Sequence, residues 1–421
     1  MKILALALGL LLCQAQAFAE NIRVNLVKDQ GSVQLAADQA FTVKNVDSGK
    51  TFSFESGKYY LNVRSGYLYV DDKMLGDRIQ ILRKDGGSLP AVNQRRYAGI
   101  LSVSSMSGEL IVNNELDLEL YLTAVLPGKS SPIMPDETIK AQAVAARSYA
   151  KYMKLLNRTK RWDIEASDRE LPFTGIGAEK DVLTSFIQQT SGEYLLDRDN
   201  MPAMAVTTEC SGGHTEDAAD IFGVAYSYLQ GVEDYDQDAP DYSWSYETTP
   251  VIVRNLLEQT GEYILGRLRN IYLSPLSEPG QDRTVNGRVR TVLINGEDGT
   301  ARVDAGILVR QLDLKSALFD VSTGVPFPDK LETPLTNFYG MEIGRKEIPI
   351  DYGRERPRSW QGMSKSAHVL KGDKDEKVTF FGRGKGHGVG LSVWGARELA
   401  NRKHSYAEIL SYYYKNTRLS K

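Results

Sequence analysis

The sequence predicts an α+β fold, with a β-rich N-terminal half, a central alanine-rich helix and a mixed α/β C-terminal half. Two observations indicate this fold. Short apolar segments separated by polar turn clusters fill the first 120 residues, and apolar residues recur at three- and four-residue spacing after Pro135. The composition is 42% apolar and 25% charged over 421 residues, which is typical of globular proteins and excludes a disordered or fibrous chain.

The first 19 residues predict a secretory signal peptide. Lys2 supplies a positive charge, residues 3–12 are apolar without interruption, and residues 17–19 form a small-x-small cleavage site. The apolar run is too short to span a bilayer, and the large residues before Cys13 do not fit a lipid-anchor site. We therefore expect export to the periplasm or the cell exterior, with no transmembrane segment left after cleavage.

Residues 20–120 are predicted to form a β-rich region of antiparallel strands. Polar turn clusters, such as residues 47–50 and 85–88, separate short segments that are rich in β-branched and aromatic residues. The expected strands are residues 22–27, 41–43, 52–54, 67–70 and 110–112, continued by residues 116–122.

An amphipathic helix is predicted from Asp136 to about Leu156. Two acidic residues occupy its first turn, where the helix dipole favours negative charge, and its alanines permit close packing. Gln142 and Tyr149 are seven residues apart and share a second face of this helix. A further helix is expected over residues 180–190.

The remaining chain alternates between predicted strands, helices and loops. The acidic, aromatic segment 234–246 is expected to be an irregular loop, and the charged segment 345–376 is loop-prone. The other expected elements are helices at residues 251–265, 307–312 and 407–414, and strands at residues 291–296 and 301–306.

The net charge of the chain argues against one class of partner, and its cysteine content indicates how the fold is stabilised. The chain has 51 Lys+Arg against 54 Asp+Glu, so its net charge of −3 provides no strong field for binding nucleic acid. Without the predicted signal peptide the balance is 50 against 54, and Cys210 is the one remaining cysteine. No internal disulfide can then form, so we expect a hydrophobic core to stabilise the protein.

Three segments have an unusual local composition: residues 128–149, 209–216 and 382–396. Two of the four histidines, His214 and His387, stand beside glycines in these segments. Glycine permits positive φ and close approach of a ligand or another backbone, so such a histidine can line a binding site. The alternative for each segment alone is a strained structural turn, and the presence of two together favours a site.

These segments resemble the SpoIID/LytB family, whose members are exported proteins that act on bacterial cell-wall glycan. The resemblance rests on several motifs in one order and extends, more weakly, over essentially the whole chain after residue 22. The matching residues are Tyr121–Leu122, Val125–Gly128, Lys140–Ala150, Ser211–Glu216, Leu229–Val232, Gly382–Ala396 and Tyr412–Tyr414.

The resemblance implies an organisation and an activity. Residues 121–421 would form the family's core around a glycan groove, with an inserted α/β segment at about 245–345. The implied activity is that of a lytic transglycosylase, which cleaves the bond between N-acetylmuramic acid and N-acetylglucosamine in strands stripped of stem peptides. Other members are enhancers of a cell-wall amidase. Peptidoglycan strands, and a cell-wall amidase as a second partner, are thus the expected ligands.

This sequence departs from the family at the residue expected to be the catalytic acid. Cleavage requires a carboxylic acid that protonates the leaving oxygen, after which the carboxylate takes the proton of the muramic 6-hydroxyl. Aligned without gaps, the family's glutamate position is occupied by Lys129. An ammonium group is positively charged at pH 7 and cannot stabilise an oxocarbenium-like transition state. We therefore expect activity to be impaired or absent.

Four other carboxylates are candidates for a displaced acid: Asp136, Glu137, Glu209 and Glu216. The sequence does not place any of them in the groove. Asp136 and Glu137 have an adequate structural explanation at a helix N-terminus, and Glu216 has one in a turn.

Neither a metal nor another cofactor is predicted. Some family members hold zinc with a histidine and two cysteines after the long helix, but residues 162–168 contain neither residue type. Cys210 and His214 alone do not make a tetrahedral site. Their spacing also suggests that Cys210 is a thiol nucleophile and His214 its general base, although a structural role for the thiol is the favoured interpretation.

The resemblance implies that a set of residues besides Lys129 lines the groove and binds substrate. Arg147 would pair with a muramic carboxylate or form an internal ion pair. Lys385 and Val393 replace the tryptophan and glutamine common in the family, which alters the sugar-contacting surface. The implied substrate-binding residues are Gln142, Arg147, Tyr149, Ser211, His214, His387, Ser392 and Trp394.

Three functional hypotheses follow from these observations. The first is a lytic-transglycosylase-like protein that acts on peptidoglycan. The second is a non-catalytic relative that binds glycan or enhances an amidase, and the missing acid favours it. The third is a structural envelope protein that uses its β-rich half for protein contacts and has no glycan groove.

Overall fold

The computed structural model describes residues 20–84, 87–126, 134–176, 181–276, 279–323, 330–336, 342–349, 367–370 and 376–421. These residues form two compact units. The first unit comprises the described residues up to Val125 together with those from Met153 to 176, and the second comprises the remainder. The predicted signal peptide lies outside the described residues.

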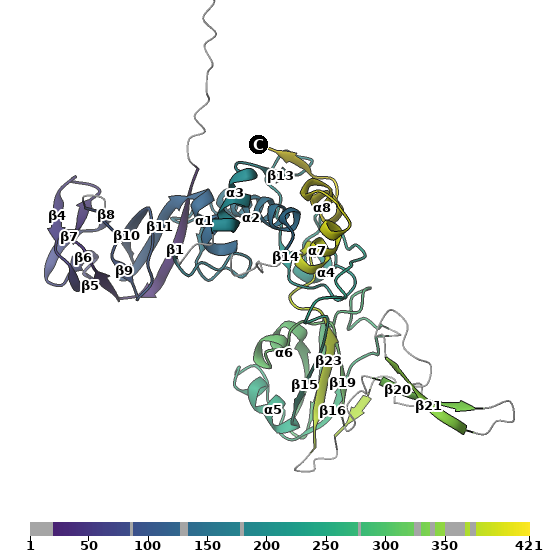
Figure 1. Ribbon diagram of the computed structural model, residues 1–421. Helices are drawn as coiled ribbons and strands as arrows, with labels where there is room; N and C mark the ends of the chain where they lie inside the picture. Colours follow the sequence, from purple (N-terminus) through teal and green to yellow (C-terminus); the bar gives the residue numbers. More distant parts are fainter. Residues whose placement is uncertain are drawn as a thin grey trace, which may run out of the picture. The chain divides into compact units, whose positions relative to one another are not determined.

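The first unit contains two β-sheets, drawn in purple and blue in Figure 1. Neighbouring strands are antiparallel, except that β12 runs parallel to β1. One sheet has the order β12 (Ile164–Glu165), β1 (Asn21–Gln30), β11 (Glu109–Asp117), β10 (Ile100–Met106), β8 (Arg78–Arg83), β3 (Phe41–Asn45) and β4 (Thr51–Phe54). The other has the order β7 (Lys73–Gly76), β6 (Tyr67–Val70), β5 (Gly57–Arg64), β2 (Ser32–Ala37) and β9 (Ala91–Val92).

The two sheets share one hydrophobic core. Alternate residues along β2 and β8 are buried, as expected for strands with one face toward a core. Leu35 and Leu61 from the second sheet join Phe41 and Ile81 from the first in this core. The aromatic ring of Phe41 also stacks on that of Phe54, with 5.1 Å between the ring centroids. Burial of these side chains holds the sheets together.

The chain returns to the first unit after residue 153. In this returning segment the buried Asp163 accepts hydrogen bonds from the guanidinium and backbone N–H of Arg23, with a shortest distance of 2.6 Å. Helix α1 (Leu118–Val125) also belongs to this unit, and the hydroxyl of its Tyr121 donates to the carbonyl of Leu171. The β-rich unit therefore includes residues well beyond position 120.

Helices form one part of the second unit. Its long helix α2 (Asp136–Leu156) is buried along most of its length, because alanines let neighbouring elements approach closely. Helix α7 (Val393–Asn401) lies against it, since the Thr138 hydroxyl donates to the Ala396 carbonyl. The other helices and short strands here are α3 (Asp181–Gln189), α4 (Ala218–Phe222), α8 (Tyr406–Tyr413), β13 (Tyr194–Leu196), β14 (Thr207–Thr208), β24 (Leu391–Ser392) and β25 (Arg418–Ser420).

Two further sheets of the second unit enclose a common core with helices α5 and α6 (Figure 1). Val253 of α5 and Leu308 of α6 are buried among side chains of both sheets. One sheet has the order β15 (Ser243–Thr248), β23 (Val378–Arg383) and β19 (Phe319–Ser322), and the other has the order β18 (Thr300–Asp304), β17 (Thr291–Gly296), β16 (Leu268–Tyr272) and β22 (Ala367–Val369). The helices are α5 (Pro250–Glu258) and α6 (Ala305–Gln311). A separate two-stranded sheet consists of β20 (Lys330–Thr336) and β21 (Glu342–Pro349).

The structure confirms the α+β class and most of the expected elements. The long helix has the predicted bounds, and the helix expected over 251–265 ends at Glu258. Three expectations were wrong. Residues 118–122 belong to helix α1, residues 243–246 lie in strand β15, and the described part of 345–376 contains strands.

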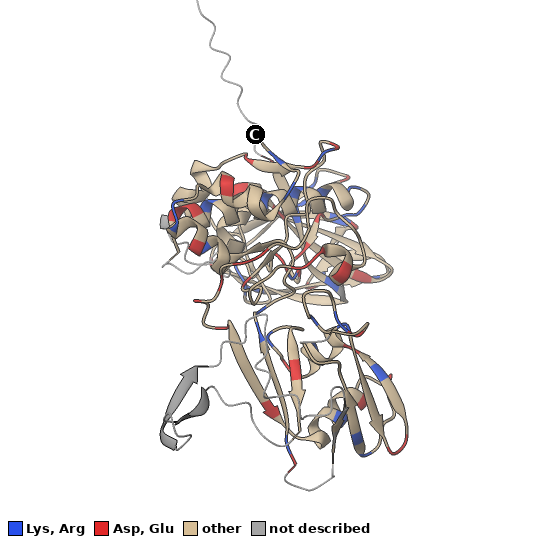
Figure 2. Ribbon diagram, turned by 90° about the vertical axis from the view of Figure 1, so that its right-hand side faces the viewer, with Lys and Arg blue, Asp and Glu red and all other residues tan. Residues whose placement is uncertain are grey.

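Charged residues of both signs are distributed over the described surface. Figure 2 shows Lys and Arg interspersed with Asp and Glu on the helices and on the sheets in that view. This pattern agrees with the nearly balanced charge of the chain. Within the described part of the chain, no helix is both long and apolar enough to cross a membrane.

Candidate functional site

The two glycine-rich segments that carry the histidines lie side by side. Cys210 and Lys385 exchange backbone hydrogen bonds of 2.8 and 3.1 Å, and the Glu216 N–H donates to the Gly388 carbonyl at 2.7 Å. Strands β14 and β24 continue the contact as a parallel pair. Segments that are far apart in the sequence thus form one paired surface, which we call the paired-loop site: residues 207–216 together with 384–392.

Glycine is required at two positions of this pairing. Gly384 has a φ of +73°, and a Cβ atom there would lie 2.7 Å from the carbonyl oxygen of Cys210. Gly388 has a φ of +81°, and its Cβ would overlap the guanidinium group of Arg288. Both the backbone conformation and the close approach exclude a side chain at these two positions.

The two histidines are half-buried, and the backbone fixes the proton on one ring nitrogen of each. His214 Nδ1 lies 2.6 Å from the Thr215 carbonyl oxygen, so Nδ1 carries a proton and donates. His387 Nδ1 accepts the Val389 N–H at 3.0 Å, so its proton is on Nε2. The His387 ring also meets the edge of Phe222, with 5.2 Å between the ring centroids.

A buried pair of carboxyl groups lies beneath the first loop. The Ser211 hydroxyl is 2.6 Å from Asp234 and 3.0 Å from Asp236, and the Gly212 N–H donates to Asp236. The Tyr413 hydroxyl of α8 donates to Asp234 at 2.6 Å. Burial, together with the charge of Asp236, raises the pKa of Asp234 to about 7. This cluster fixes the loop to α8 from within the core, away from solvent.

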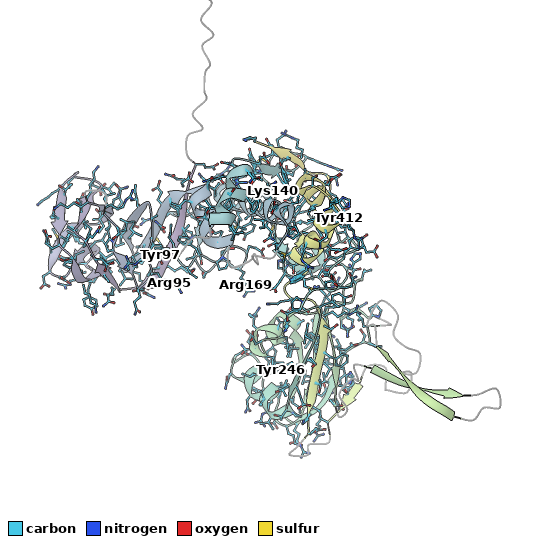
Figure 3. The ribbon with its side chains drawn as sticks, in the orientation of Figure 1. Arg95, Tyr97, Lys140, Arg169, Tyr246 and Tyr412 are labelled. Carbon is cyan, nitrogen blue, oxygen red and sulfur yellow. The ribbon has the colours of Figure 1, made fainter. Side chains whose placement is uncertain are left out.

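The preceding residue of α8 reinforces the same connection. The Tyr412 hydroxyl, labelled in Figure 3, donates to the carbonyl oxygen of Glu233 at 2.6 Å. Tyr412 and Tyr413 therefore hold the segment around residue 234 at two adjacent points.

Arg288 connects the α/β part of the second unit to both glycine-rich loops. Its guanidinium donates to the carbonyls of Ser211 and Gly386 at 2.8 and 3.1 Å. Its Nε lies 3.6 Å from the carboxylate of Glu216, and both side chains are 1% exposed. The guanidinium also lies over Gly388, which explains the glycine there.

Glu216 receives two further hydrogen bonds in the interior. The Thr284 hydroxyl and the Asn286 amide donate to it at 3.2 and 3.4 Å. Burial raises the pKa of Glu216, and the charge of Arg288 opposes that rise. Glu216 is therefore enclosed by the 284–288 turn.

The half-exposed edge of the paired-loop site carries a network of ion pairs. The ammonium of Lys385 lies 2.9 Å from Glu209 and 3.2 Å from Asp241, and Lys315 also pairs with Asp241. The hydrogen bond to Glu209 raises the pKa of Lys385, and the bond from Lys315 lowers that of Asp241.

Ser392 and Trp394 lie at the start of α7 and have different environments. Ser392 is fully buried, and its hydroxyl caps the helix by accepting the Gly395 N–H at 3.2 Å. Trp394 is half-buried, its backbone N–H donates to the Glu209 carbonyl, and the guanidinium of Arg397 lies 5.0 Å from the centroid of its ring. Of these two, Trp394 is the residue that reaches the surface.

Gln142, Arg147 and Tyr149 are all buried on helix α2. The Arg147 guanidinium donates to the carbonyls of Glu193 and Ile187 at 2.8 and 3.4 Å, near the C-terminal end of α3. These bonds give Arg147 an internal role. In this arrangement the three side chains are not presented at the surface.

Lys129 and Cys210 are the remaining candidate residues from the sequence. Lys129 lies outside the described residues. The Cys210 thiol is fully buried and donates to Asp236 at 3.2 Å, and its burial raises its pKa, which does not favour a nucleophile. Among the residues that the structure describes, no group of three or more potential ligands could hold a metal ion.

Sequence reasoning missed three buried residues that organise the site: Arg288, Asp234 and Asp236. Asp234 and Asp236 stand in a segment rich in acidic residues, where their burial leaves no local signal. Arg288 comes from a part of the chain distant from both loops.

Comparisons with known proteins show which proteins this chain resembles. The SpoIID family model, described as stage II sporulation protein, matches residues 106–196. An uncharacterized protein of Brachyspira hyodysenteriae is 26% identical over 79% of this chain and 73% of its own length. The amidase enhancer of Bacillus subtilis is 23% identical over 90% of this chain and 52% of its own length. Stage II sporulation protein D of the same organism is 24% identical over 72% of this chain and 75% of its own. The chain is therefore similar to proteins of the SpoIID/LytB family, and residues 106–196 carry the match to the family model.

Proposed function

We propose that this protein is exported, binds glycan strands of peptidoglycan at the paired-loop site, and does not cleave them. The observation that carries the proposal is the pairing of the two glycine-rich loops, which brings the half-exposed His214 and His387 into one continuous backbone arrangement. Trp394 follows directly on the second loop and is tied to the first through the Glu209 carbonyl.

The chemistry of these side chains suits a carbohydrate. A sugar ring has an apolar face of C–H groups and a rim of hydroxyls. An indole ring supplies a flat apolar surface, and imidazole nitrogens supply a donor and an acceptor.

The proposal that the protein does not cleave glycan rests on Lys129 and on the carboxylates that the sequence analysis considered as replacements. The resemblance places Lys129 at the acid position, where an ammonium cannot support positive charge developing on the sugar. Glu216, one candidate replacement, is enclosed by Arg288 and by the 284–288 turn. Its raised pKa would suit an acid, but its side chain is 1% exposed and has no access to a glycosidic oxygen.

Two of the other candidate acids are engaged in hydrogen bonds or ion pairs. Glu209 pairs with Lys385, and the Glu137 carboxylate accepts bonds from Lys140 and from the backbone N–H of Tyr406. These bonds outweigh burial and lower the pKa of Glu137, so it is ionised at neutral pH. Asp136 is exposed in the first turn of α2.

A second candidate function is enhancement of a cell-wall amidase. The match to the amidase enhancer covers 90% of this chain, more than the match to stage II sporulation protein D. A glycan-binding protein without cleavage activity is compatible with such a role, because it would act by presenting strands to the amidase.

Digestion of purified glycan strands tests the proposal. Strands with and without stem peptides are incubated with the protein, with a Lys129→Glu variant and with a Lys129→Gln control, and 1,6-anhydromuramic products are detected by mass spectrometry. We expect product from the Lys129→Glu variant alone, because only that variant restores an acid. Product from the unaltered protein would contradict the proposal.

The amidase role needs its own assay. Release of stem peptides from sacculi by a purified cell-wall amidase is measured with and without this protein. A several-fold faster release would support the enhancer function, and an unchanged rate would exclude it for that amidase.

A further inference from the structure

An aromatic ring outside the family motifs reaches the surface beside His387. Phe222 is the last residue of α4, and its side chain is 37% exposed. Its ring centroid lies 5.2 Å from that of His387, with 62° between the ring planes. The two rings therefore form an edge-to-face pair, with an apolar ring next to a polar one.

Phe222 is held in place from several directions. Gly223, with a φ of +73°, ends α4, and its N–H donates to the Ala219 carbonyl. Before the helix, Asp217 accepts the Gly231 N–H at 2.7 Å. Within it, Asp220 pairs with Arg290. The short helix is thus tied to its neighbours, and the ring of Phe222 has a defined position next to the paired-loop site.

The charges described near this ring are matched by other residues of the protein. Asp220 pairs with Arg290 on one side, and Lys385, two residues before His387, pairs with Glu209. Stacking of a pyranose ring on Phe222 requires no change in these pairs, because the contacts of the ring are C–H groups and hydroxyls.

We propose that Phe222 is a platform for a pyranose ring of the glycan, with the His387 imidazole at the edge of the stacked sugar. The inference rests on the proposed function and names a contact within that site. The C–H face of the sugar would cover the exposed part of the phenyl ring and remove apolar surface from water.

Affinity for peptide-free glycan strands tests this inference. Binding of the protein as it stands is measured by sedimentation or calorimetry, alongside Phe222→Ala, Phe222→Trp and Val224→Ala. We expect Phe222→Ala to weaken binding about tenfold, the order expected when one aromatic contact is lost. Phe222→Trp should bind at least as tightly as the parent, because an indole also stacks on a sugar ring.

The control and the thermal midpoints separate binding from folding. Val224 is 51% exposed and lies two residues beyond Phe222, so Val224→Ala removes exposed apolar surface without removing the ring. It should leave affinity unchanged, and all variants should melt close to the parent. Equal affinity of Phe222→Ala and parent would overturn the inference. Loss of binding in both Phe222→Ala and Phe222→Trp would also overturn it, since packing against His387 would then be the role. No binding by the parent would refute the proposed function itself.

Discussion

Buried charged residues hold the paired-loop site together. Arg288 binds carbonyl oxygens of both loops and pairs with Glu216, while Ser211 bridges Asp234 and Asp236. Such groups are costly to bury and remain favourable only when their partners are all present. The half-exposed histidines are therefore positioned by residues that do not themselves reach the surface.

Removing Arg288 should strongly destabilise the protein. In Arg288→Met, Glu216 stays buried without its cationic partner, and we expect a loss of about 3–5 kcal/mol in the free energy of unfolding. Urea unfolding measures this change. Arg290→Met is the control, because Arg290 is 42% exposed in its pair with Asp220 and should cost less than about 1 kcal/mol. Similar losses for both variants would argue against a buried ionic centre.

Asp234 should make stability depend on pH. Its pKa is raised to about 7 by burial and by Asp236, so the folded state holds a proton that the unfolded chain releases near pH 4. The stability contribution is therefore fully present below about pH 4 and is lost as pH rises through about 7. Thermal melts from pH 5 to 8 should show a midpoint that falls with pH.

An Asp234→Asn variant tests the assignment of that dependence. It should flatten the fall in midpoint over this pH range, because the group no longer ionises. Asp238→Asn serves as the matched control, since the Asp238 side chain is 79% exposed. The assignment fails if Asp234→Asn keeps the full slope, or if Asp238→Asn removes it.

Part of the site was predictable at the residue scale. His214 and His387 were identified from the glycines beside them, and glycine is required where these loops approach other groups. Arg288 gave no signal, because its role depends on contacts with loops distant in the sequence. The same holds for Asp234, whose burial beneath Ser211 arises from tertiary packing.

At the scale of single elements, local patterns predicted helices well where they were long. Apolar spacing over twenty residues sufficed for α2. Helix α1 was mistaken for a strand because Leu118, Leu120 and Leu122 alternate with other residues. The side chain of Asp117 accepts the Leu120 N–H at 3.0 Å, so a helix-capping signal was present. Strand β15 was missed because its partner β23 lies far along the chain.

Arg147 should matter for the packing of α2 against α3. In Arg147→Met, the carbonyls of Glu193 and Ile187 lose a charged donor, and we expect a loss of about 1.5–3 kcal/mol in unfolding free energy. Chemical denaturation checks this value, with the exposed Arg158→Met as control. An unchanged stability combined with lost glycan binding would instead assign Arg147 to the ligand.

At the scale of the whole molecule, the chain passes repeatedly between its two units. Residues 153–176 return to the first unit, where β12 pairs with β1 and Asp163 binds Arg23. Local sequence patterns cannot reveal this return, since β12 has two residues and its pairing is long-range. The overall class was predictable from the strand-rich and helix-rich composition, whereas the boundary was not.

Because residues 153–176 pack in the first unit, removal of the N-terminal residues should destabilise the rest of the chain. A chain that begins at residue 121 keeps Asp163 and Ile164 but loses the strand and the arginine that cover them. We expect lower soluble yield and a less cooperative melt than for the chain that begins at residue 20. A truncated chain that melts as cooperatively as the longer one would show that residues 153–176 do not depend on the first sheet.

The most direct test of the account is whether the unaltered protein binds peptide-free glycan strands and leaves them intact. Sedimentation with purified strands, followed by mass spectrometry of the supernatant, measures both properties in one sample, with His387→Ala as the comparison. The account predicts saturable binding, weaker binding by a folded His387→Ala variant, and no 1,6-anhydromuramic product. Absence of binding, equal binding by both proteins, or release of that product would contradict it.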